Sequence, residues 1–291
     1  MVRIENHAFH AEIALHGAEL KKLRSKRTGI DYLWDGNGSW KRSAPVLFPN
    51  IGGLADEKFV FQGKEYPAPA HGFARDMDFA LKEKTDSKAV FALHSNSQTA
   101  TYFPFEFELD ITYALDEDGL NVIWQVINCG DNEMYFSIGA HPGFKLLPDS
   151  SLCDYALYFD RNIRIETRRV IGRYLTEEKE VLVDQCNVLP LSAELMEKDA
   201  IILEDTGIQR ITLRNQKRGY GLWIEFPDFP VVAVWTDPHM VKQAQFICLE
   251  PWCGINALCG ETKEDISRKA RVTRLDKNGI FQRAYKIGVE E

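Results

Sequence analysis

The 291-residue sequence lacks a long basic run, and acidic residues outnumber basic ones by 43 to 35. The net charge of -8 disfavours nucleic acid or an anionic membrane surface as the main partner, because both attract positive charge. No stretch approaches the roughly 18 consecutive apolar residues of a membrane-spanning helix. The N-terminal MVRIENHAFHAEIALHG scatters charges among its apolar residues and lacks the apolar core of a secretion signal. We therefore expect a cytoplasmic protein that binds neither nucleic acid nor membrane.

C-x-x-C pairs are also missing, although the sequence has six cysteines: Cys129, Cys153, Cys186, Cys248, Cys253 and Cys259. Without an export signal these are predicted to be reduced thiols. Three of them fall within CLEPWCGINALC, but zinc sites made of thiolates pair their ligands at tighter spacing. The sequence therefore predicts buried small side chains there and no metal site.

Several enzyme signatures are absent. There is no G-x-S-x-G nucleophile elbow, no G-x-x-x-x-G-K-[ST] phosphate loop and no H-E-x-x-H zinc motif. The closely spaced glycines of DGNGSW, residues 35–40, precede no Lys-Ser or Lys-Thr pair and predict a surface turn.

Helical periodicity is scarce, whereas strand alternation is clear. Only LSAELMEKDA, residues 191–200, predicts one or two helical turns, with Ser192 as N-cap and with Leu195 and Met196 facing inward. FEFELDITYAL, residues 105–115, alternates apolar and polar side chains, which is typical of a strand with one buried face.

Turn residues between apolar runs predict hairpins. DEDG joins FEFELDITYAL to the apolar LNVIWQVIN, and FVFQGKEY turns at Gln62 and Gly63. GYGLWIEF and VVAVWTD are two further strands, separated by PDFP. Strands do not alternate with long helices, which disfavours a doubly wound parallel sheet. We predict one all-β domain over residues 1–291, a size that sandwiches and barrels reach as a single unit.

Three segments combine an ionisable side chain with a constrained backbone: PAHGFARD with His71 and Arg75, SIGAHPGF with His141, and CLEPWCG with Glu250. A residue before proline is restricted to extended geometry, so His141 and Glu250 are predicted to project from strand ends. Taken singly, each segment also fits a solvated turn histidine, a surface ion pair or a charge at the rim of a sheet.

Taken in order, the segments are more specific. APVLFPNIG, HGFAR, GAHPGF and LEPWCG resemble the motif series of the aldose 1-epimerase (galactose mutarotase) family, in particular its LacX-like branch. The resemblance starts near residue 17 and covers most of the chain. It implies a large, mostly antiparallel β-sandwich of the galactose mutarotase-like supersandwich type, with an open sugar cleft and no cofactor. The implied activity is exchange of the α and β anomers of a hexose or hexose phosphate by a monomer or homodimer.

The resemblance also implies roles for individual residues. Glu250 is the catalytic base and His141 the catalytic acid, while His71 and Arg75 bind sugar hydroxyls or the negative charge that develops near the ring oxygen. MEKDAIIL nominates Asp199 as a further sugar-binding acid, with Asp205 and Asp237 as open alternatives. Trp252 and Trp235 offer ring faces to sugar C–H groups or are plain core aromatics.

The chemistry fits these residue types. Opening a hemiacetal ring needs a base for the proton of the anomeric hydroxyl and an acid for the ring oxygen. The apolar strand before Glu250 predicts a raised pKa for that carboxyl, and histidine titrates near neutral pH without tuning. We expect the two groups to face each other across a gap as wide as one pyranose ring.

One departure from the family pattern affects substrate choice. Many relatives carry a basic residue after the glycine of LFPxxG, where this chain has Gly53 and Leu54. Arg75, Lys41 or Arg42 are candidates to compensate, and the sequence does not show whether a phosphate subsite exists.

Two other functions compete with the mutarotase interpretation. A non-catalytic sugar-binding protein would need neither His141 nor Glu250, yet both are present. A glycoside hydrolase requires two carboxyl groups about 5–9.5 Å apart, and Glu250 has no second acid in an equally constrained motif.

Overall fold

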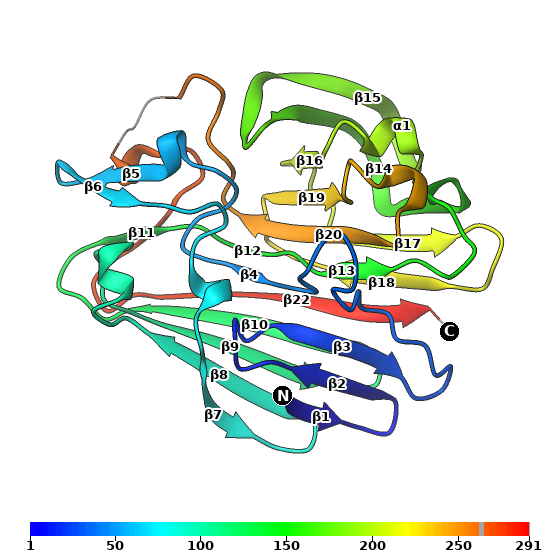
Figure 1. Ribbon diagram of the computed structural model, residues 1–291, viewed down its shortest axis with the longest axis horizontal. Helices are drawn as coiled ribbons and strands as arrows, with labels where there is room; N and C mark the ends of the chain where they lie inside the picture. Colours follow the sequence, from blue (N-terminus) through cyan, green and yellow to red (C-terminus); the bar gives the residue numbers. More distant parts are fainter. Residues whose placement is uncertain (262–264, 291) are drawn as a thin grey trace.

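The structure, a computed structural model, describes residues 1–261 and 265–290, and strands make up most of its regular structure (Figure 1). Helix α1 (Ala193–Met196) is a single turn whose N-cap, Ser192, accepts a hydrogen bond from the Leu195 N–H. Met196 is buried and Leu195 half-buried. The remaining helical residues of the described part form 3₁₀ turns, at Ala55–Glu57, Ala74–Asp76, Thr99–Thr101, Leu152–Asp154, Val241–Gln243 and Ile266–Arg268. An all-β fold with very little helix is confirmed.

The helices of the described residues are all too short and too polar to cross a membrane. All six cysteines lie in the described part, and each is a free thiol.

The largest sheet has nine antiparallel strands. Across it they follow the order β15 (Tyr174–Pro190), β14 (Tyr155–Ile171), β17 (Arg210–Asn215), β18 (Gly221–Glu225), β22 (Ile280–Glu290), β10 (Gly119–Asn128), β9 (Phe107–Leu115), β8 (Lys88–His94) and β7 (Ala80–Lys84). Strands β9 and β10 form the predicted hairpin, but β9 starts at Phe107 rather than at Phe105. Strands β14 and β15 form a long hairpin that arches over the upper edge of the molecule in Figure 1.

The second sheet carries the candidate site. Its strands are β16 (Ile201–Glu204), β19 (Val231–Trp235), β20 (Phe246–Cys253), β12 (Ile138–Ala140) and β4 (Val46–Leu47), with β13 (Gly143–Lys145) also paired to β20. The two strands predicted on either side of PDFP therefore lie in different sheets, because β18 belongs to the nine-stranded sheet and β19 to this one.

Three smaller sheets complete the fold. One contains β1 (Val2–Glu5), β2 (Phe9–Ile13) and β3 (Leu20–Ser25), and another pairs β11 (Met134–Phe136) with β21 (Thr273–Leu275). The third is the predicted hairpin of β5 (Lys58–Phe61) and β6 (Lys64–Pro67), which turns at Gln62 and Gly63 with positive φ at both residues.

The sheets pack on one main hydrophobic core. Leu23 of β3, Leu109 of β9 and Leu249 of β20 all belong to this core, and each is fully buried. Buried apolar area of this kind contributes roughly 25 cal/mol per Å² to the free energy of folding. The nine-stranded, six-stranded and three-stranded sheets are thus layers of a β-sandwich, as the sequence resemblance implied. That the chain is a single domain stays a prediction.

Strand β20 lies in the middle of its sheet, and all eight of its residues are buried. Side chains alternate between the two faces of a strand, so Ile247 and Leu249 point to the main core while Cys248, Glu250 and Trp252 share the opposite face. Glu250 was predicted at the end of this strand, and that prediction is wrong, because β20 continues through Trp252 to Cys253.

The neighbouring strands explain why proline does not end β20. The Leu249 N–H donates to the Pro142 carbonyl, which lies between β12 and β13. The backbone nitrogen of Pro251 faces the same side, since donors two residues apart point to the same neighbour. Strand pairing is interrupted there, so the missing N–H of proline breaks no ladder hydrogen bond.

Candidate active site

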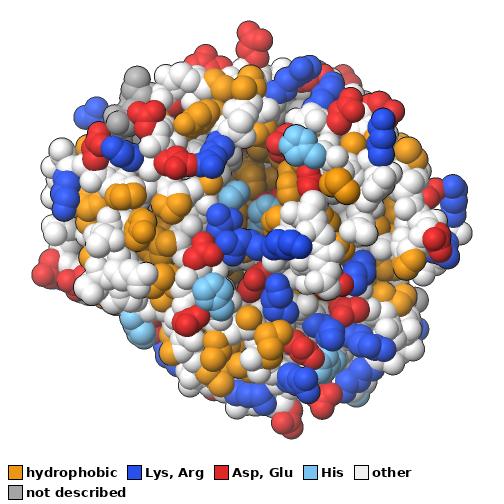
Figure 2. Space-filling view, viewed as in Figure 1, with side chains coloured by type: hydrophobic (Ala, Val, Ile, Leu, Met, Phe, Trp, Pro, Cys, Tyr) orange, Lys and Arg blue, Asp and Glu red, His pale blue; other side chains and the backbone are white. Residues whose placement is uncertain are grey.

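A cavity of about 320 Å³ opens on the face of the six-stranded sheet that carries Glu250. This volume is within the range of small-molecule sites. Figure 2 shows a hollow on this side of the molecule with histidine at its base and with Lys and Arg side chains beside it. The cavity is lined by Trp40, His71, Arg75, His141, Val170, Gly172, Arg173, Asp199, Ala200, Ile202, Trp235, Glu250, Trp252 and Asn256. Seven residues nominated from the sequence therefore lie together: Glu250, His141, His71, Arg75, Asp199, Trp252 and Trp235.

Small residues make room for Glu250 within the sheet. Its partner on β19 is Ala233, so the neighbouring strand places no large side chain beside the carboxyl group. Trp252, two residues along, is held by a hydrogen bond from its indole N–H to the Ala140 carbonyl at 3.2 Å. A Cβ atom on Gly139 would lie 2.6 Å from Cδ1 of Trp252, so only glycine lets the ring pack there. Trp252 therefore packs in a hydrophobic cluster and also lines the cavity.

His141 sits where the chain passes from β12 to β13. Trp40 stacks on its imidazole, with ring centroids 4.9 Å apart and planes at 28°. Trp235 and His71 approach the same ring edge-on, at 5.5 Å and 5.6 Å. These contacts hold the imidazole in one orientation.

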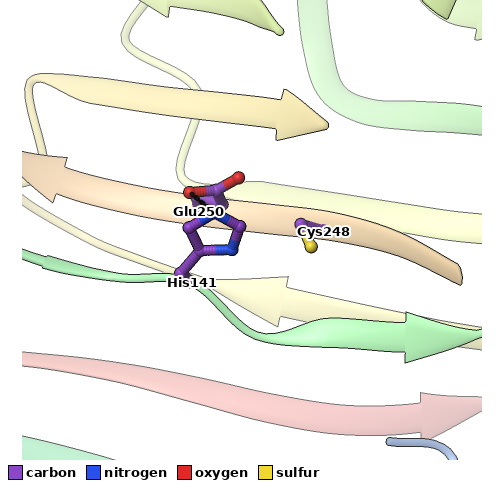
Figure 3. A group of neighbouring side chains, drawn as sticks. All are labelled: His141, Cys248 and Glu250. Atoms are coloured by element: carbon purple, nitrogen blue, oxygen red, sulfur yellow. Dashed lines mark ion pairs between the residues drawn. The ribbon is translucent and has the colours of Figure 1, made fainter. Parts of the chain in front are cut away.

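The Nε2 atom of His141 lies 3.3 Å from Oε2 of Glu250, as Figure 3 shows. The angles at the imidazole nitrogen and the carboxyl oxygen are unsuitable for a hydrogen bond. Oε2 of Glu250 therefore has no hydrogen-bond partner among the described residues. The expectation of a gap as wide as a sugar ring is therefore wrong. Because β12 and β20 are paired through Gly139 and Trp252, His141 leaves β12 directly beside Glu250.

Burial shifts the pKa values of Glu250 and His141 in opposite directions. It raises the pKa of Glu250 well above its usual value, and the charge of Asp199 adds to the rise. It lowers the pKa of His141 well below 6.5, helped by His71 and Arg75. The raised pKa of Glu250 agrees with the sequence prediction. The prediction that His141 has an ordinary pKa is wrong, because the buried ring loses the hydration that stabilises its charged form.

His71 is a neutral hydrogen-bond donor to the cavity. Its Nδ1 accepts a hydrogen bond from the Gly52 N–H at 3.2 Å, so the proton of the neutral ring is on Nε2. Burial and the charges of Arg75 and Arg42 lower its pKa to about 3. The residue has a φ of 65°, in the left-handed region.

Some N–H groups of the Arg75 side chain are available to a ligand. One terminal nitrogen donates to the Ala70 carbonyl at 2.7 Å, whereas Nε has no hydrogen-bond partner among the described residues. The nearest carboxylate, that of Asp76, is 3.7 Å from Nε and also binds Arg42 at 2.8 Å. Burial, followed by the charge of Arg42, lowers the pKa of Arg75 to about 10, so the side chain is still a cation at neutral pH.

Of the three acids left open by the sequence, Asp199 is the one that lines the cavity. Burial raises its pKa, while hydrogen bonds from the Ala200 N–H and from Trp235 oppose the rise. Asp205 instead forms an exposed ion pair with Arg271. Asp237 accepts a hydrogen bond from the His239 N–H and does not line the cavity.

Among the cavity residues that sequence reasoning missed, three have side chains able to bind a sugar: Trp40, Arg173 and Asn256. Trp40 ends the segment that predicted only a surface turn. Arg173 lies at the tip of the β14–β15 hairpin and packs against Gly53. Gly53 follows the glycine of LFPxxG, where many relatives carry a basic residue. The hairpin brings a cation to this place from 120 residues away in the chain, a proximity that no local pattern signals.

Asn256 connects this hairpin to the cavity. Its side-chain NH₂ donates to the Arg173 carbonyl at 3.1 Å, and its Oδ1 is buried with no partner among the described residues. A buried acceptor without a donor is costly, so this oxygen is suited to a ligand hydroxyl.

A larger cavity of about 420 Å³ lies elsewhere, between Trp34, Leu147 and Gln245. Histidine and glutamate are absent from its lining, and its Asp35 is paired with Lys145 at 3.0 Å. We assign the chemistry to the smaller cavity, because His141 and Glu250 meet there.

Known proteins resemble this chain in sequence and in fold. A family model described as aldose 1-epimerase matches residues 1–264. The chain is 28% identical to the plasmid-encoded protein LacX of Lactococcus lactis subsp. lactis, covering 94% of this chain and 95% of that protein. A solved galactose mutarotase-like protein from Lactobacillus casei ATCC 334 is 35% identical with a TM-score of 0.92, covering 99% of both chains. A galactose mutarotase related enzyme from Lactobacillus acidophilus is 28% identical with a TM-score of 0.93, covering 100% and 97%.

Proposed function

The chain belongs to the aldose 1-epimerase family, and from that premise we propose that it is a mutarotase, an isomerase that interconverts the α and β anomers of a hexose or hexose phosphate. The observation that carries the proposal is the 3.3 Å contact between His141 and Glu250 inside a cavity of sugar size. The anomeric hydroxyl oxygen and the ring oxygen of an aldose are bonded to the same carbon. Two adjacent proton-transfer groups therefore reach both oxygens at once.

In the proposed reaction one group removes the proton of the anomeric hydroxyl while the other protonates the ring oxygen. The bond between the anomeric carbon and the ring oxygen then breaks and leaves an open-chain aldehyde. Rotation about the adjacent C–C bond presents the other face of the aldehyde to the ring hydroxyl. Reclosure returns both protons, so the enzyme ends as it began.

We propose that Glu250 and His141 act as one unit that holds a single proton. The pKa shifts favour that proton on Glu250 in the free enzyme, with a neutral His141 beside it. Moving the proton across the contact gives the arrangement in which Glu250 is the base and His141 the acid. In either arrangement the pair has one proton to give and one site to accept another, which is the requirement of bifunctional acid–base catalysis.

Other cavity residues fit the binding of sugar hydroxyls. His71 Nε2 and Arg75 Nε are donors, and Asp199 and the Asn256 Oδ1 are acceptors. The cations Arg75 and Arg173 also line the cavity, which is why sugar phosphates belong in the substrate panel.

The test is one-dimensional proton NMR or polarimetry on freshly dissolved α-glucose, α-galactose and their 6-phosphates. We expect anomer exchange faster than the buffer-catalysed rate on at least one of the four sugars. Binding of a sugar without acceleration of any of them would instead support the non-catalytic sugar-binding protein.

The pH dependence of kcat/KM separates the proton-sharing pair from a histidine of ordinary pKa. Activity requires exactly one proton on the pair, and it is lost at low pH when His141 also protonates and at high pH when Glu250 loses its proton. Because the pKa of His141 is lowered and that of Glu250 raised, we expect kcat/KM to stay flat as the pH rises through 6.5. Measurements from about pH 5 to 8, corrected for the buffer rate, check this. A fall in kcat/KM centred near 6.5 would instead show an essential imidazolium with an ordinary pKa.

Asp199 is expected to affect sugar binding. Replacing it with alanine removes an acceptor from the cavity and should raise KM about tenfold, the effect of losing one hydrogen bond to a charged or strongly polar group. The matched control is Asp205→Ala, which breaks an exposed ion pair with Arg271 and should leave KM unchanged. Equal KM values for the two variants would remove Asp199 from the binding site.

A further inference from the structure

Cys248 lies on the same face of β20 as Glu250, two residues before it. Its side chain is fully buried, in a cluster with Trp34 and Phe246 against which Trp40 and Trp235 also pack. Ligand atoms of His141, Cys248 and Glu250 all lie within 4.8 Å of one another. Figure 3 shows the thiol on the side of the imidazole where Nδ1 is located.

The polar atoms of this group lack partners. Nδ1 of His141 and Oε2 of Glu250 are buried and have no hydrogen-bond partner among the described residues. His141 and Glu250 are only 8% and 1% exposed as whole residues. Buried unpaired nitrogen and oxygen atoms are costly, and a bound ligand would remove that cost.

We infer that His141, Cys248 and Glu250 form a binding site for a thiophilic divalent cation, with Zn²⁺ as the best match, beside the sugar cavity that His141 and Glu250 line. The set of one thiolate, one imidazole and one carboxylate suits zinc, which binds all three ligand types. Three protein ligands leave the fourth position of a tetrahedral ion free for a further ligand.

The site forms only on binding. Zinc–ligand distances are about 2.0–2.3 Å, so ligand atoms as far apart as 4.8 Å must close in by about 1 Å. Rotation of the Glu250 side chain toward Cys248 supplies such a shift, because the small Ala233 stands beside it. Burial holds the pKa of the Cys248 thiol well above its usual value, so the thiol keeps its proton until a cation supplies positive charge.

The ion and the sugar exclude each other. The cation uses His141 and Glu250, the two side chains that the proposed reaction needs, so neither is free to exchange a proton with the sugar while the ion is bound. Binding of the ion does not depend on the proposed function; only its inhibition of anomer exchange does. The two ideas can therefore fail separately.

Cobalt(II) reports on the thiolate ligand without any sugar. We expect a Co²⁺ titration of the reduced protein to give a thiolate-to-cobalt charge-transfer absorption that saturates at one ion per chain. Cys248→Ala should abolish it. Cys253→Ala is the matched control, because Cys253 is buried on the same strand but faces the opposite side, and it should keep the full absorption. An absorption that survives in Cys248→Ala, or is absent from the wild type, would overturn the site.

Zinc then tests the competition with sugar. On a sugar that the wild type turns over, Zn²⁺ should raise KM without changing kcat. Cys248→Ala should raise the zinc concentration for half inhibition about tenfold or more, the scale on which metal sites respond to a damaged ligand set. Thermal melting confirms folding, and Cys248→Ser replaces the alanine variant if that variant does not fold. Equal inhibition of wild type and variant would show that zinc acts elsewhere.

Discussion

Replacing Glu250 with glutamine is expected to lower kcat for anomer exchange by about 10²–10⁴-fold, the usual contribution of one positioned proton-transfer group. Glutamine keeps the size of the side chain and its ability to hydrogen-bond the sugar, but it neither accepts nor releases a proton at the required pH. The position is fully buried, beside Ala233 on β19 and His141. Measurement of anomer exchange by NMR over a range of sugar concentrations separates kcat from KM.

The control is a glutamate outside the cavity. Glu225 lies on β18 of the nine-stranded sheet and is paired with Arg210 at 3.4 Å, so Glu225→Gln should keep the wild-type kcat. If Glu250→Gln also kept kcat within a factor of about two, Glu250 would not transfer a proton in the rate-limiting step.

His141→Asn is the second change with a large expected effect. Asparagine fills part of the volume of the imidazole but cannot exchange a proton, and Trp40 loses the ring on which it stacks. We expect kcat to fall by about 10²–10⁴-fold as for Glu250. His94→Asn, at an exposed histidine on β8 far from the cavity lining, should leave kcat unchanged.

The double variant tests whether the pair works as a unit. Residues that act as one catalytic unit show non-additive losses, because removing either member already disables the other. We expect Glu250→Gln/His141→Asn to be only slightly slower than the slower single variant. Losses that multiply would contradict proton sharing and assign an independent step to each residue.

Local patterns predicted much of the fold. Two hairpins were predicted from local signals: the alternation in residues 105–115 and the turn residues at 62–63 and 116–119. Such prediction is possible because register and turn chemistry depend on a few neighbouring residues. The same patterns could not separate β18 from β19. Both are short apolar strands joined by a turn, and only the competition for partners across the whole molecule places them in different sheets.

The position of Glu250 shows the limit of local reasoning in the site. Proline after Glu250 predicted a strand end, since proline breaks a ladder that needs its N–H. The ladder on that side is already interrupted between β12 and β13, so β20 runs on. That interruption involves residues more than 100 positions earlier, and the local sequence around Glu250 contains no sign of it.

By itself the sequence determined the strand content, the family and four ionisable residues of the cavity, His71, Arg75, His141 and Glu250, because each of these depends on residue type and short spacing. Tertiary structure decided that Glu250 and His141 touch, that Arg173 reaches the cavity from the β14–β15 hairpin, and that Cys248 lies beside the pair. Those contacts depend on which strands pair across the sandwich. Burial then shifts the pKa of Glu250 and of His141 in opposite directions, an effect of desolvation that only the packed structure produces.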